Sequence, residues 1–498
     1  MKLSIKNKAT AAACAAFLAL GTFSCQNDLL SPVPTTAFSD QVVFSTPARI
    51  ALQVNNLYAY VKTGSFLGGR YQIYGDIRAN DFVNRTSNGV TGLGVWNHTL
   101  TEASQNDVIN TWGAAYAAIN QANVFLAGLD NNAALFVAPT FAADYATTAN
   151  NYRGEARLLR ALSYYSLLQL YARPYTDGNG SKPGLPLRIL AETGPQNNDL
   201  ARSTVAEVYA QILSDLNFAE TNLPLTYGSA TLNVTRAHRN TAIALKTRVY
   251  LSMGRYADVI TEANKLVPTA APFAASSGVA NALNASVTAV FAAPQETAES
   301  ILSFPFTAQD PPGTQNQLAF YYLPASLGGG GEYGLNTGAG SIYANTNWAA
   351  TDARRVNFVA KSGTEYFLTK YPNGTPFIDK APVIRYAEVL LNLAEARVRS
   401  TNTVDAQALV LLNAVRSRSS ATPYTAAGLG TVAATTDALL LERRIEFLGE
   451  GLRNMDLMRL GATIPGKGSI GAVEPTNVLY VWPIPSTELA TNALMTRN

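Results

Sequence analysis

The stretch "RNTAIALKTRVYLSMGRYADVITEANKL", residues 239–266, contains the most informative local pattern of the chain. Apolar side chains recur at helical spacing on both sides of a Gly-Arg pair at 254–255, which is typical of two amphipathic helices joined by a tight turn. Ala242, Ala257 and Ala263 place small side chains where the facing helices must approach each other closely. The stretch therefore predicts a helical hairpin.

Other segments carry the same helical periodicity. The segment "EARLLRALSYYSLLQLYARPY", residues 155–175, is apolar on more than one face, and Pro174 ends it. Thr204 and Glu207 then stand at capping-box spacing before the next apolar stripe, and further helical patterns begin at Arg385. The hairpin resembles a tetratricopeptide unit, but the pairs do not recur at a fixed period of about 34 residues, as a plain solenoid would require. The predicted fold class is mainly α, with tetratricopeptide-like helical hairpins and a loop-rich lobe that contains short strands.

The predicted lobe covers about residues 267–380, which are rich in Ala, Gly, Pro, Asn and Tyr and poor in helical stripes. Within it, "ESILSFPF" predicts a short strand and "LGGGGEYGLNTGAG" predicts a loop. Residues 66–100 are similarly irregular. A stretch this long without helices is usually functional or disordered, and its tyrosines and Trp348 argue against disorder. The helical scaffold is then expected mainly at 41–266 and 381–460.

The N-terminus predicts export and lipid attachment. Residues 1–24 carry three lysines, no acidic residue and the short apolar core "ATAAACAAFLALG", which is typical of a signal peptide and too short to span a bilayer. "TFSC" resembles a bacterial lipobox, in which Cys25 becomes the acylated first residue of the mature chain. Residues 25–40 then form a polar tether. We expect contact with the membrane through this lipid anchor alone.

Overall charge argues against a nucleic-acid partner. The 498 residues include 37 basic and 34 acidic side chains, and the N-terminal lysines supply the entire excess of three. The remaining chain is formally neutral and has no basic run of the kind that contacts phosphate backbones.

Signatures of catalysis are sparse. The sequence has no HExxH, GxSxG or paired-cysteine metal pattern, and a GxGxxG match at 329–334 lacks the strand-turn-helix context of a dinucleotide site. The sequence therefore predicts no enzyme, no cofactor and no metal site. Two rows of charged and polar residues at three- and four-residue spacing favour structural ion pairs over a pair of catalytic carboxylates: Arg385, Glu388, Asn392 and Glu395, and Arg443, Glu446, Glu450 and Arg453.

Aromatic and polar residues of the two irregular regions are the candidates for ligand binding. Flat rings stack on the apolar faces of sugar rings or peptide groups, while amides and charged groups bond hydroxyls. The alternative is that most of these rings are loop anchors buried in the core. The predicted ligand-binding residues are Arg78, Asp81, Trp96, Asn97, Tyr322, Tyr333, Asn336 and Trp348.

Several motifs in order resemble the SusD/RagB family of outer-membrane nutrient-binding lipoproteins. The early helix "EARLLRALSYYSLLQLY" and the capped segment "STVAEVYAQILSDLNFAETNLP" are similar to the family's first helices. The segments "RYAEVLLNLAEA", "LLNAVRSR", "LERRIEFLGEGLRNMDLMRLG" and "VWPIPSTEL" resemble its C-terminal motifs. The resemblance covers nearly the whole mature chain, so residues 41–498 are expected to form one domain of this type.

This resemblance implies four tetratricopeptide-like hairpins, a loop-rich lobe with the ligand contacts, and no catalysis. It also implies a place on the outer membrane, facing the cell exterior, beside a SusC-like TonB-dependent transporter that receives oligosaccharides or sometimes peptides. These motifs are scaffold motifs and identify no ligand residue. Two other function classes remain open from the residues: an exported glycoside hydrolase or peptidase, and a helical-repeat scaffold that binds only protein.

Overall fold

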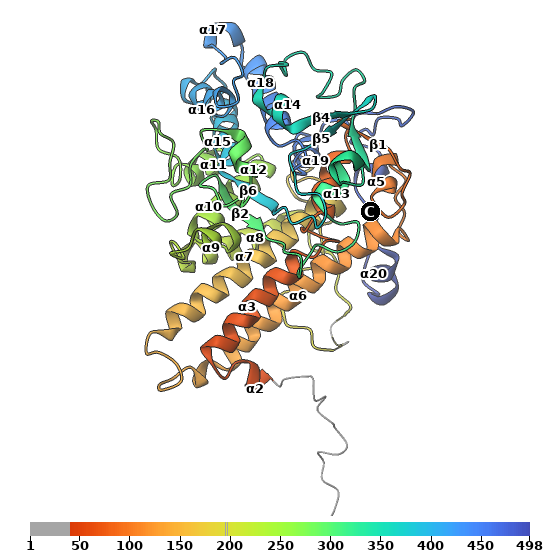
Figure 1. Cartoon of the computed structure of the whole chain (residues 1–498). Coiled ribbons are helices and arrows are strands. Elements are labelled where there is room, and N and C mark those ends of the chain that lie inside the picture. The colour runs from red at the N-terminus through yellow and green to blue at the C-terminus, as the bar shows by residue number, and fades with distance from the viewer. Residues whose placement is uncertain (1–39, 195, 197) are drawn as a thin grey trace, which may run out of the picture.

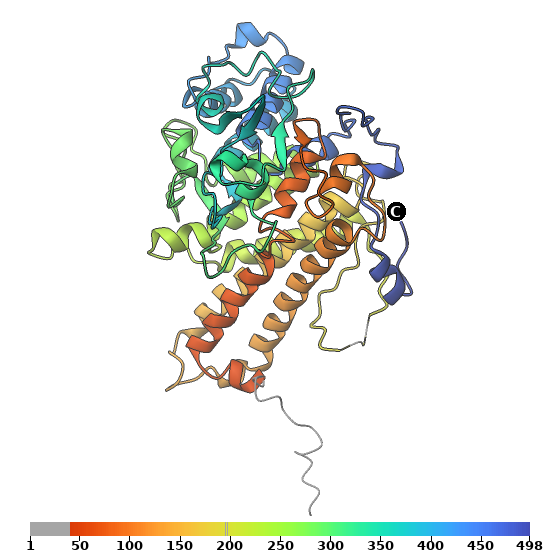
Figure 2. The ribbon, with the colours of Figure 1, turned by 45° about the vertical axis from the view of Figure 1, so that its right-hand side comes forward.

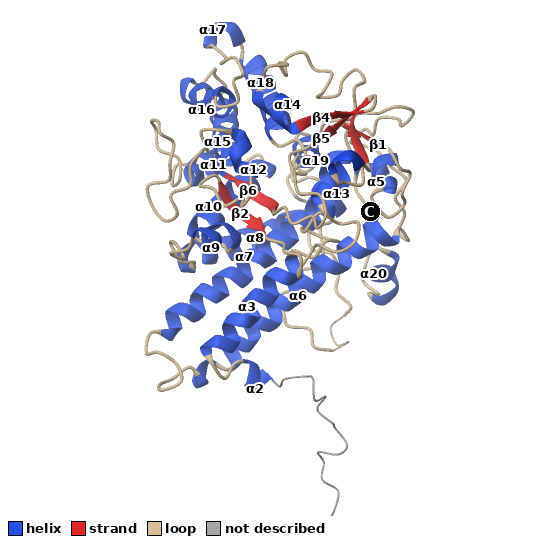
Figure 3. Cartoon of the chain, viewed as in Figure 1, coloured by secondary structure: helices blue, strands red, loops and turns tan. Residues whose placement is uncertain are grey.

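The computed structural model describes residues 40–498, apart from 195 and 197. The predicted signal peptide, Cys25 and the predicted tether up to residue 39 lie outside the described residues. Helices and loops make up most of the chain, and the strands are few and short (Figure 3). The mainly helical fold class is confirmed.

Three long helices form one end of the molecule, at the bottom of Figure 1. They are α3 (Pro47–Val61), α6 (Asn110–Asn131) and α7 (Tyr145–Tyr171), and they remain side by side in the turned view of Figure 2. The C-terminal half of α7 is buried on all sides, which explains why its sequence is apolar on more than one face. The helix ends before Pro174, as predicted.

The hairpin at 239–266 is confirmed. Its helices are α10 (Arg239–Ser252) and α11 (Tyr256–Ala263), and the turn between them places Gly254 at a φ of +70°, where a residue without a Cβ is favoured. Helix α8 (Val205–Asn222) packs between α7 and α10. Its predicted capping box is present, since Glu207 N donates to Thr204 Oγ1 at 3.2 Å and Thr204 N donates to Glu207 Oε2 at 2.7 Å.

A second group of helices continues the stack toward the top of Figure 1. Helix α15 (Tyr386–Thr401) packs against α11 on one side and against α16 (Ala406–Ser417) and α18 (Val432–Glu446) on the other. The remaining helices are short: α2 (Asp40–Val43), α4 (Arg70–Ile77), α5 (Leu93–Asn97), α9 (Ala230–Thr235), α12 (Val287–Phe291), α13 (Leu318–Tyr322), α14 (Ala353–Phe358), α17 (Ala426–Leu429), α19 (Arg453–Arg459) and α20 (Ser486–Thr491).

Strands within the described residues form two-stranded antiparallel pairs. Strand β1 (Phe82–Asn84) pairs with β3 (Tyr333–Leu335), and β4 (Val359–Ser362) pairs with β5 (Glu365–Leu368). The predicted strand in "ESILSFPF" is β2 (Ser300–Phe304), and it pairs with β6 (Ala381–Arg385). Figure 3 shows β2 and β6 apart from the other strands, between the two helical groups.

Three predictions about local structure are wrong. Strand β3 lies inside the glycine-rich stretch predicted as loop, because it pairs with a strand about 250 residues earlier in the chain. Residues 381–385 form β6 rather than part of the helical scaffold. The irregular region 66–100 contains α4 and α5, and α4 is buried on every side, so its sequence shows no amphipathic stripe.

One large hydrophobic core joins the helical groups and the lobe. It includes Tyr322, Tyr333 and Trp348 from the lobe together with the inner faces of α7, α10 and α15. Along the described residues, no helix combines the length and the apolar character needed to cross a bilayer.

Candidate functional site

Five of the eight predicted ligand residues are buried: Arg78, Asp81, Tyr322, Tyr333 and Trp348. The Tyr322 hydroxyl donates to Asp76 Oδ2 at 3.1 Å, and the Tyr333 hydroxyl donates to the Thr91 carbonyl at 2.8 Å. The Trp348 side chain is 2% exposed, and Arg355 lies over its ring. These three rings hold loops in the core, which is the alternative that the sequence left open.

The other three predicted residues, Trp96, Asn97 and Asn336, keep part of their surface exposed. Trp96 lies on α5, and its indole N–H donates to the Phe82 carbonyl at 3.0 Å. The Asn336 side-chain amide donates to the Asn80 carbonyl at 2.7 Å. Both side chains are therefore fixed by backbone atoms of the segment 78–82, but at different edges of it: Asn336 follows β3, whereas Trp96 bonds the Phe82 carbonyl, which points away from β3.

Two further side chains, which were not predicted from the sequence, contact the segment 78–82. Arg444 of α18 donates to Asp81 Oδ2 through Nε at 2.9 Å and to the Gly340 carbonyl at 3.0 Å. Lys467 donates to the Arg78 carbonyl at 2.7 Å, and its ammonium lies 5.6 Å from the centre of the Trp96 ring. We call the partly exposed side chains of Trp96 and Asn97, with the buried Lys467 beside the Trp96 ring, the Trp96 face.

Sequence reasoning missed Arg444 and Lys467 for different reasons. Arg444 follows Arg443 directly, and neighbouring residues on a helix point about 100° apart, so the two arginines face different surroundings. Lys467 belongs to "GATIPGKGS", which resembles a phosphate loop only in part. No local pattern connects either residue with a segment that lies more than 350 residues earlier.

Buried charge near the Trp96 face is predominantly positive. The Arg78 guanidinium donates to Asn454 Oδ1 at 3.1 Å and to the carbonyls of Leu479 and Tyr480, both at 2.7 Å. Burial lowers the pKa of Arg78 to about 10. Burial, followed by the charge of Arg78, lowers the pKa of Lys467 to about 7, so this amine is about half protonated at neutral pH. Neither cation forms an ion pair with a carboxylate of the described residues.

Neighbouring titratable groups do not offset this charge at neutral pH. Burial raises the pKa of Asp76 to about 8, so this carboxyl is mostly protonated at pH 7. Burial and the charge of Lys467 lower the pKa of His98 to about 4, so the ring is neutral. Asp81 is a nearby carboxylate that opposes the positive charge, and Arg444 already pairs with it.

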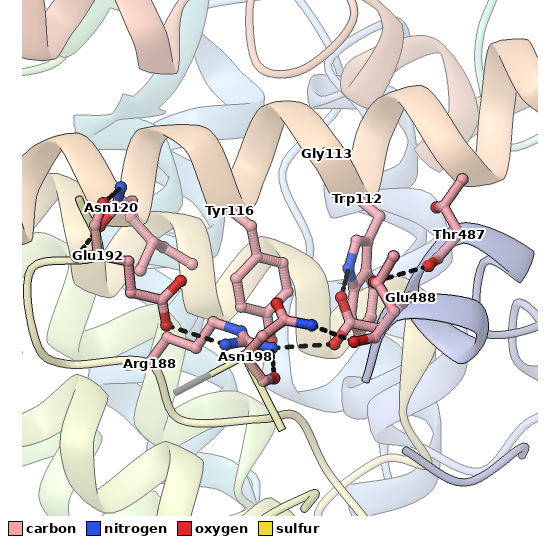
Figure 4. A pocket seen from close by; sticks show the side chains of 11 residues that line it. Trp112, Gly113, Tyr116, Asn120, Arg188, Glu192, Asn198, Thr487 and Glu488 are labelled. Atoms are coloured by element: carbon pink, nitrogen blue, oxygen red, sulfur yellow. Dashed lines mark hydrogen bonds and ion pairs between the residues drawn. The ribbon is translucent and has the colours of Figure 1, made fainter. Parts of the chain in front are cut away.

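A concave region of about 290 Å³ lies between α6, the loop around Arg188 and α20 (Figure 4). Arg188 donates to Glu192 Oε1 at 2.9 Å and to Glu488 Oε1 at 3.3 Å. The Trp112 indole N–H donates to Glu488 Oε2 at 3.2 Å, and the Tyr116 hydroxyl donates to the Pro186 carbonyl at 2.9 Å. We call this region the α6 pocket.

Polar groups of the α6 pocket bond mainly to one another, as the dashed lines of Figure 4 illustrate. Asn120 both donates to the Glu192 carbonyl and accepts from the Glu192 amide, at 2.8 and 2.9 Å. These bonds tie a loop and the C-terminal helix to α6. These contacts stabilise the packing of the loop and α20 against α6. The aromatic side chains that line the pocket resemble those of a ligand site, but its polar groups are already engaged.

No group of three or more His, Cys, Asp or Glu side chains suited to a metal ion occurs among residues 40–498 as described. The ion-pair rows predicted from the sequence are largely confirmed. Arg385 pairs with Glu299, Glu446 and Glu450, and Arg459 pairs with Glu395 at 2.7 Å. These buried carboxylates are therefore engaged in structural contacts.

Comparison with known proteins gives a consistent result. A family described as "Starch-binding associating with outer membrane" matches residues 37–251, and the "SusD family" matches residues 343–498. A crystal structure of a SusD superfamily protein from Bacteroides fragilis is 32% identical and superposes with a TM-score of 0.80 over 91% of this chain and all of that one. The chain belongs to the SusD/RagB family.

Two more distant members of the family match nearly the full chain. "SusD-like protein P38" of Formosa agariphila is 23% identical, and the match covers 97% of each chain. A solved structure called "Laminarin binding SusD-like protein" is 20% identical and has a TM-score of 0.69 over 91% of this chain and 99% of that one. At 20% identity, the similarity to the laminarin-binding protein supports the fold alone.

Proposed function

We propose that this SusD/RagB protein is a cell-surface lipoprotein that captures oligosaccharides on the Trp96 face and delivers them to a SusC-like TonB-dependent transporter. The observation that carries the proposal is a partly exposed tryptophan ring held rigidly in place in a member of this family. A ring fixed by its own N–H loses little side-chain freedom when a sugar stacks on it. Capture and delivery require no chemical step, so we assign no catalytic residue.

Neighbouring groups on the Trp96 face suit a sugar. Asn97 follows Trp96 on α5 and is partly exposed, and its amide can both donate to and accept from a hydroxyl. Among the described residues, the buried carboxylate clusters that could suggest a glycosidase are instead locked in ion pairs with arginine or lysine. Asp76, which is protonated at pH 7, is 2% exposed and accepts from the Tyr322 hydroxyl and the Gly451 amide, whereas a hydrolase needs a carboxyl group that reaches the sugar.

The Trp96→Ala variant tests the site. Titration calorimetry against a panel of oligosaccharides should give a loss of affinity of about tenfold, since an aromatic contact is worth up to about 1.5 kcal/mol beyond its area. The matched control is Tyr60→Ala, which removes a ring that is 40% exposed on α3, away from the face, and should leave affinity unchanged. Equal affinity of Trp96→Ala and the unmodified protein would exclude this site.

The same titrations separate the other function classes. Chromatography of the mixtures should recover the saccharides intact, whereas shortened products would favour the hydrolase alternative. A protein that binds no saccharide but co-purifies with other proteins would favour the helical-repeat scaffold.

Cys25 carries the proposed lipid anchor and lies outside the described residues. In cells that express the full chain, Cys25→Ala should move the protein from the outer-membrane fraction to a soluble fraction, because the acyl chains supply the membrane affinity. Detergent extracts of the unmodified protein should contain the proposed barrel partner. Retention of the Cys25→Ala variant in the membrane would contradict the anchor.

A further inference from the structure

An exposed apolar segment follows α6. Residues 133–143, "AALFVAPTFAA", comprise ten apolar residues and one threonine, and no charged residue occurs between Asp130 and Asp144. Leu135 is 48% exposed and Val137 is 60% exposed. Single exposed apolar residues are common on proteins, but a continuous uncharged stretch of this kind indicates contact with another apolar surface. We call this segment the 133–143 loop.

Aromatic packing gives the 133–143 loop a defined shape. The ring centre of Phe136 lies 5.0 Å from that of Phe141 and 5.4 Å from that of Tyr145, and the last two are 4.7 Å apart. Phe141 and Tyr145 are buried, and Phe136 packs against the core. The neighbours of Phe136 on either side, Leu135 and Val137, are exposed. The loop therefore presents these two aliphatic side chains to the outside on a packed aromatic support.

Several backbone amides of the loop bond inside it. The loop begins with the 3₁₀ turn η3 (Ala133–Leu135), and Leu135 N donates to the Asn132 carbonyl at 2.9 Å. Val137 N donates to the Leu135 carbonyl at 2.9 Å, and Phe141 N donates to the Val137 carbonyl at 3.1 Å. Because unpaired amides resist transfer into an apolar medium, these bonds lower the cost of placing the loop in one.

The 133–143 loop lies at the end of the molecule where the described chain begins. Helix α2 starts at Asp40, and the ring of Phe44 just after it lies 6.0 Å from the ring of Phe125 on α6. A Cβ on Gly128, near the end of α6, would come within 2.2 Å of the Phe44 ring. Figure 1 shows α2 at this end of the three long helices. The chain thus enters the fold beside the loop.

The proposed anchor restrains this end of the molecule. Cys25 precedes Asp40 by 15 residues, which span about 50 Å when fully extended. Attachment through Cys25 therefore keeps the end that carries the 133–143 loop within a short distance of the bilayer. A covalent anchor also raises the local concentration of lipid at the loop, so that even a weak apolar contact is populated.

We propose that the 133–143 loop contacts the lipid surface beside the anchor, with Leu135 and Val137 inserted among the acyl chains. This inference rests on the lipid anchor of the proposed function and adds a second membrane contact. One flexible attachment point holds a protein at a membrane without orienting it. A second contact, on a folded loop, would fix which end faces the lipid.

Orientation matters because the Trp96 face lies toward the other end of α6. Helix α6 is about 33 Å long, and the π-helical turn η2 (Gln105–Ile109) precedes it. A Cβ on Gly94 of α5 would lie 3.4 Å from Asp107 Oδ2 in this turn, which places α5 at the N-terminal end of α6. Lipid contact by the 133–143 loop would therefore hold the Trp96 face away from the membrane, where saccharides reach it.

Lipid fits the loop better than a protein surface does. Protein interfaces combine an apolar centre with many hydrogen bonds from polar side chains, and the loop offers only one threonine hydroxyl. Its flanking charges are the acidic Asp130, which pairs with Arg153 at 2.7 Å, and Asp144. Anionic headgroups would gain nothing from these residues, so the contact should depend on apolar insertion and be insensitive to salt.

The test measures contact between the loop and acyl chains directly. The acylated full chain carrying Leu135→Cys or Val137→Cys, labelled with a thiol-reactive fluorophore, is reconstituted into phosphatidylcholine vesicles with brominated acyl chains. Emission should fall about threefold or more relative to vesicles without bromine, and added sodium chloride should not change this. The matched controls are Val410→Cys, 48% exposed, and Val356→Cys, 61% exposed. These lie on α16 and α14 at the opposite end of Figure 1, so their emission should stay unchanged.

A charge introduced into the loop tests apolar insertion. In the labelled Leu135→Cys protein, the additional change Val137→Glu should restore most of the emission, because a carboxylate resists entry into the acyl region. Val356→Glu in the same background is the control and should leave the quenching unchanged. Equal quenching in both double variants would overturn the inserted arrangement.

Each contrary outcome has a distinct meaning. Labelled protein that fails to float with the vesicles would overturn the lipid anchor of the proposed function and this inference with it. Protein that floats, but whose labels at positions 135 and 137 are quenched no more than the controls, would overturn the loop contact while the anchor stands. Labels that lipid never quenches, but that become shielded from a water-soluble quencher when the barrel partner is added, would assign the loop to a protein interface and reject the lipid contact.

Discussion

Two clusters of cations in the molecule differ in their partners. In the first, Arg354, Arg385 and Arg418 share the carboxylates of Glu299, Glu442, Glu446 and Glu450. In the second, Arg78, Arg453 and Lys467 form no ion pair within the described residues. The first cluster joins β6, α14 and α18, whereas Arg78 and Lys467 of the second lie next to Trp96.

Electrostatics gives the two clusters different consequences. Removal of a cation from the first cluster leaves buried carboxylates without a partner, which strongly destabilises a fold. Removal of Arg453 from the second cluster leaves no carboxylate without a partner, because this partly exposed guanidinium forms no ion pair within the described residues. Four substitutions test this difference.

The largest effect is expected for Arg385→Met in the first cluster. Glu299, Glu446 and Glu450 would each lose a partner in a buried site, so the free energy of unfolding should fall by about 3–5 kcal/mol in chemical denaturation. The control, Arg153→Gln, breaks a pair with an exposed Asp130 and should cost less than about 1 kcal/mol. Similar losses for both variants would contradict the difference between buried and exposed pairs.

Asp76→Asn is expected to remove a dependence of stability on pH. The raised pKa of about 8 means that the folded protein keeps this proton between about pH 4 and 8, whereas the unfolded chain has lost it. Stability of the unmodified protein should therefore fall across this range as pH rises, by up to about 1.4 kcal/mol per pH unit relative to the variant. Parallel pH profiles of the two proteins would show that Asp76 is ionised and that it compensates part of the positive charge.

A smaller loss is expected for Glu488→Gln in the α6 pocket. Glu488 accepts from Trp112, Arg188 and Asn492, and a neutral amide would satisfy fewer of these donors. The free energy of unfolding should fall by about 1–3 kcal/mol, while the affinity for oligosaccharides stays unchanged. A large loss of affinity with little loss of stability would instead identify the α6 pocket as a binding site.

The smallest effect on stability is expected for Arg453→Gln. Because its guanidinium is partly exposed and has no partner within the described residues, the variant should differ from the unmodified protein by less than about 0.5 kcal/mol. Arg443→Gln is the matched control, since Arg443 bonds Asp456 at 2.9 Å and Asn392 at 2.6 Å and should be clearly destabilised. A destabilised Arg453→Gln variant would assign this arginine to the scaffold.

Prediction from the sequence succeeded where the evidence was local. The capping box of α8 spans three residues, and the hairpin of α10 and α11 depends on apolar spacing and a glycine turn. The two rows of charges correctly indicated ion pairs, although helix periodicity accounts only for the members on α15 and α18, since Arg385 ends β6, Glu450 lies in a turn and Arg453 begins α19.

The candidate site was less predictable. Trp96, Asn97 and Asn336 were predicted from their residue types, and they are partly exposed. Tyr322, Tyr333 and Trp348 come from sequence of the same composition, but their side chains are buried. Aromatic residues in an irregular region can hold a loop in the core or present a ring to solvent, and composition does not distinguish the two.

The sequence by itself determined the mainly helical fold, the hairpin turn and the helix caps, because these features depend on interactions between residues a few positions apart. The tertiary structure alone decided which cations are paired and which rings are exposed. Arg444 reaches Asp81 across 363 positions of the chain, and Lys467 reaches the Arg78 carbonyl across 389. Ion pairing and burial depend on neighbours in space, so packing decided how charge is distributed at the Trp96 face.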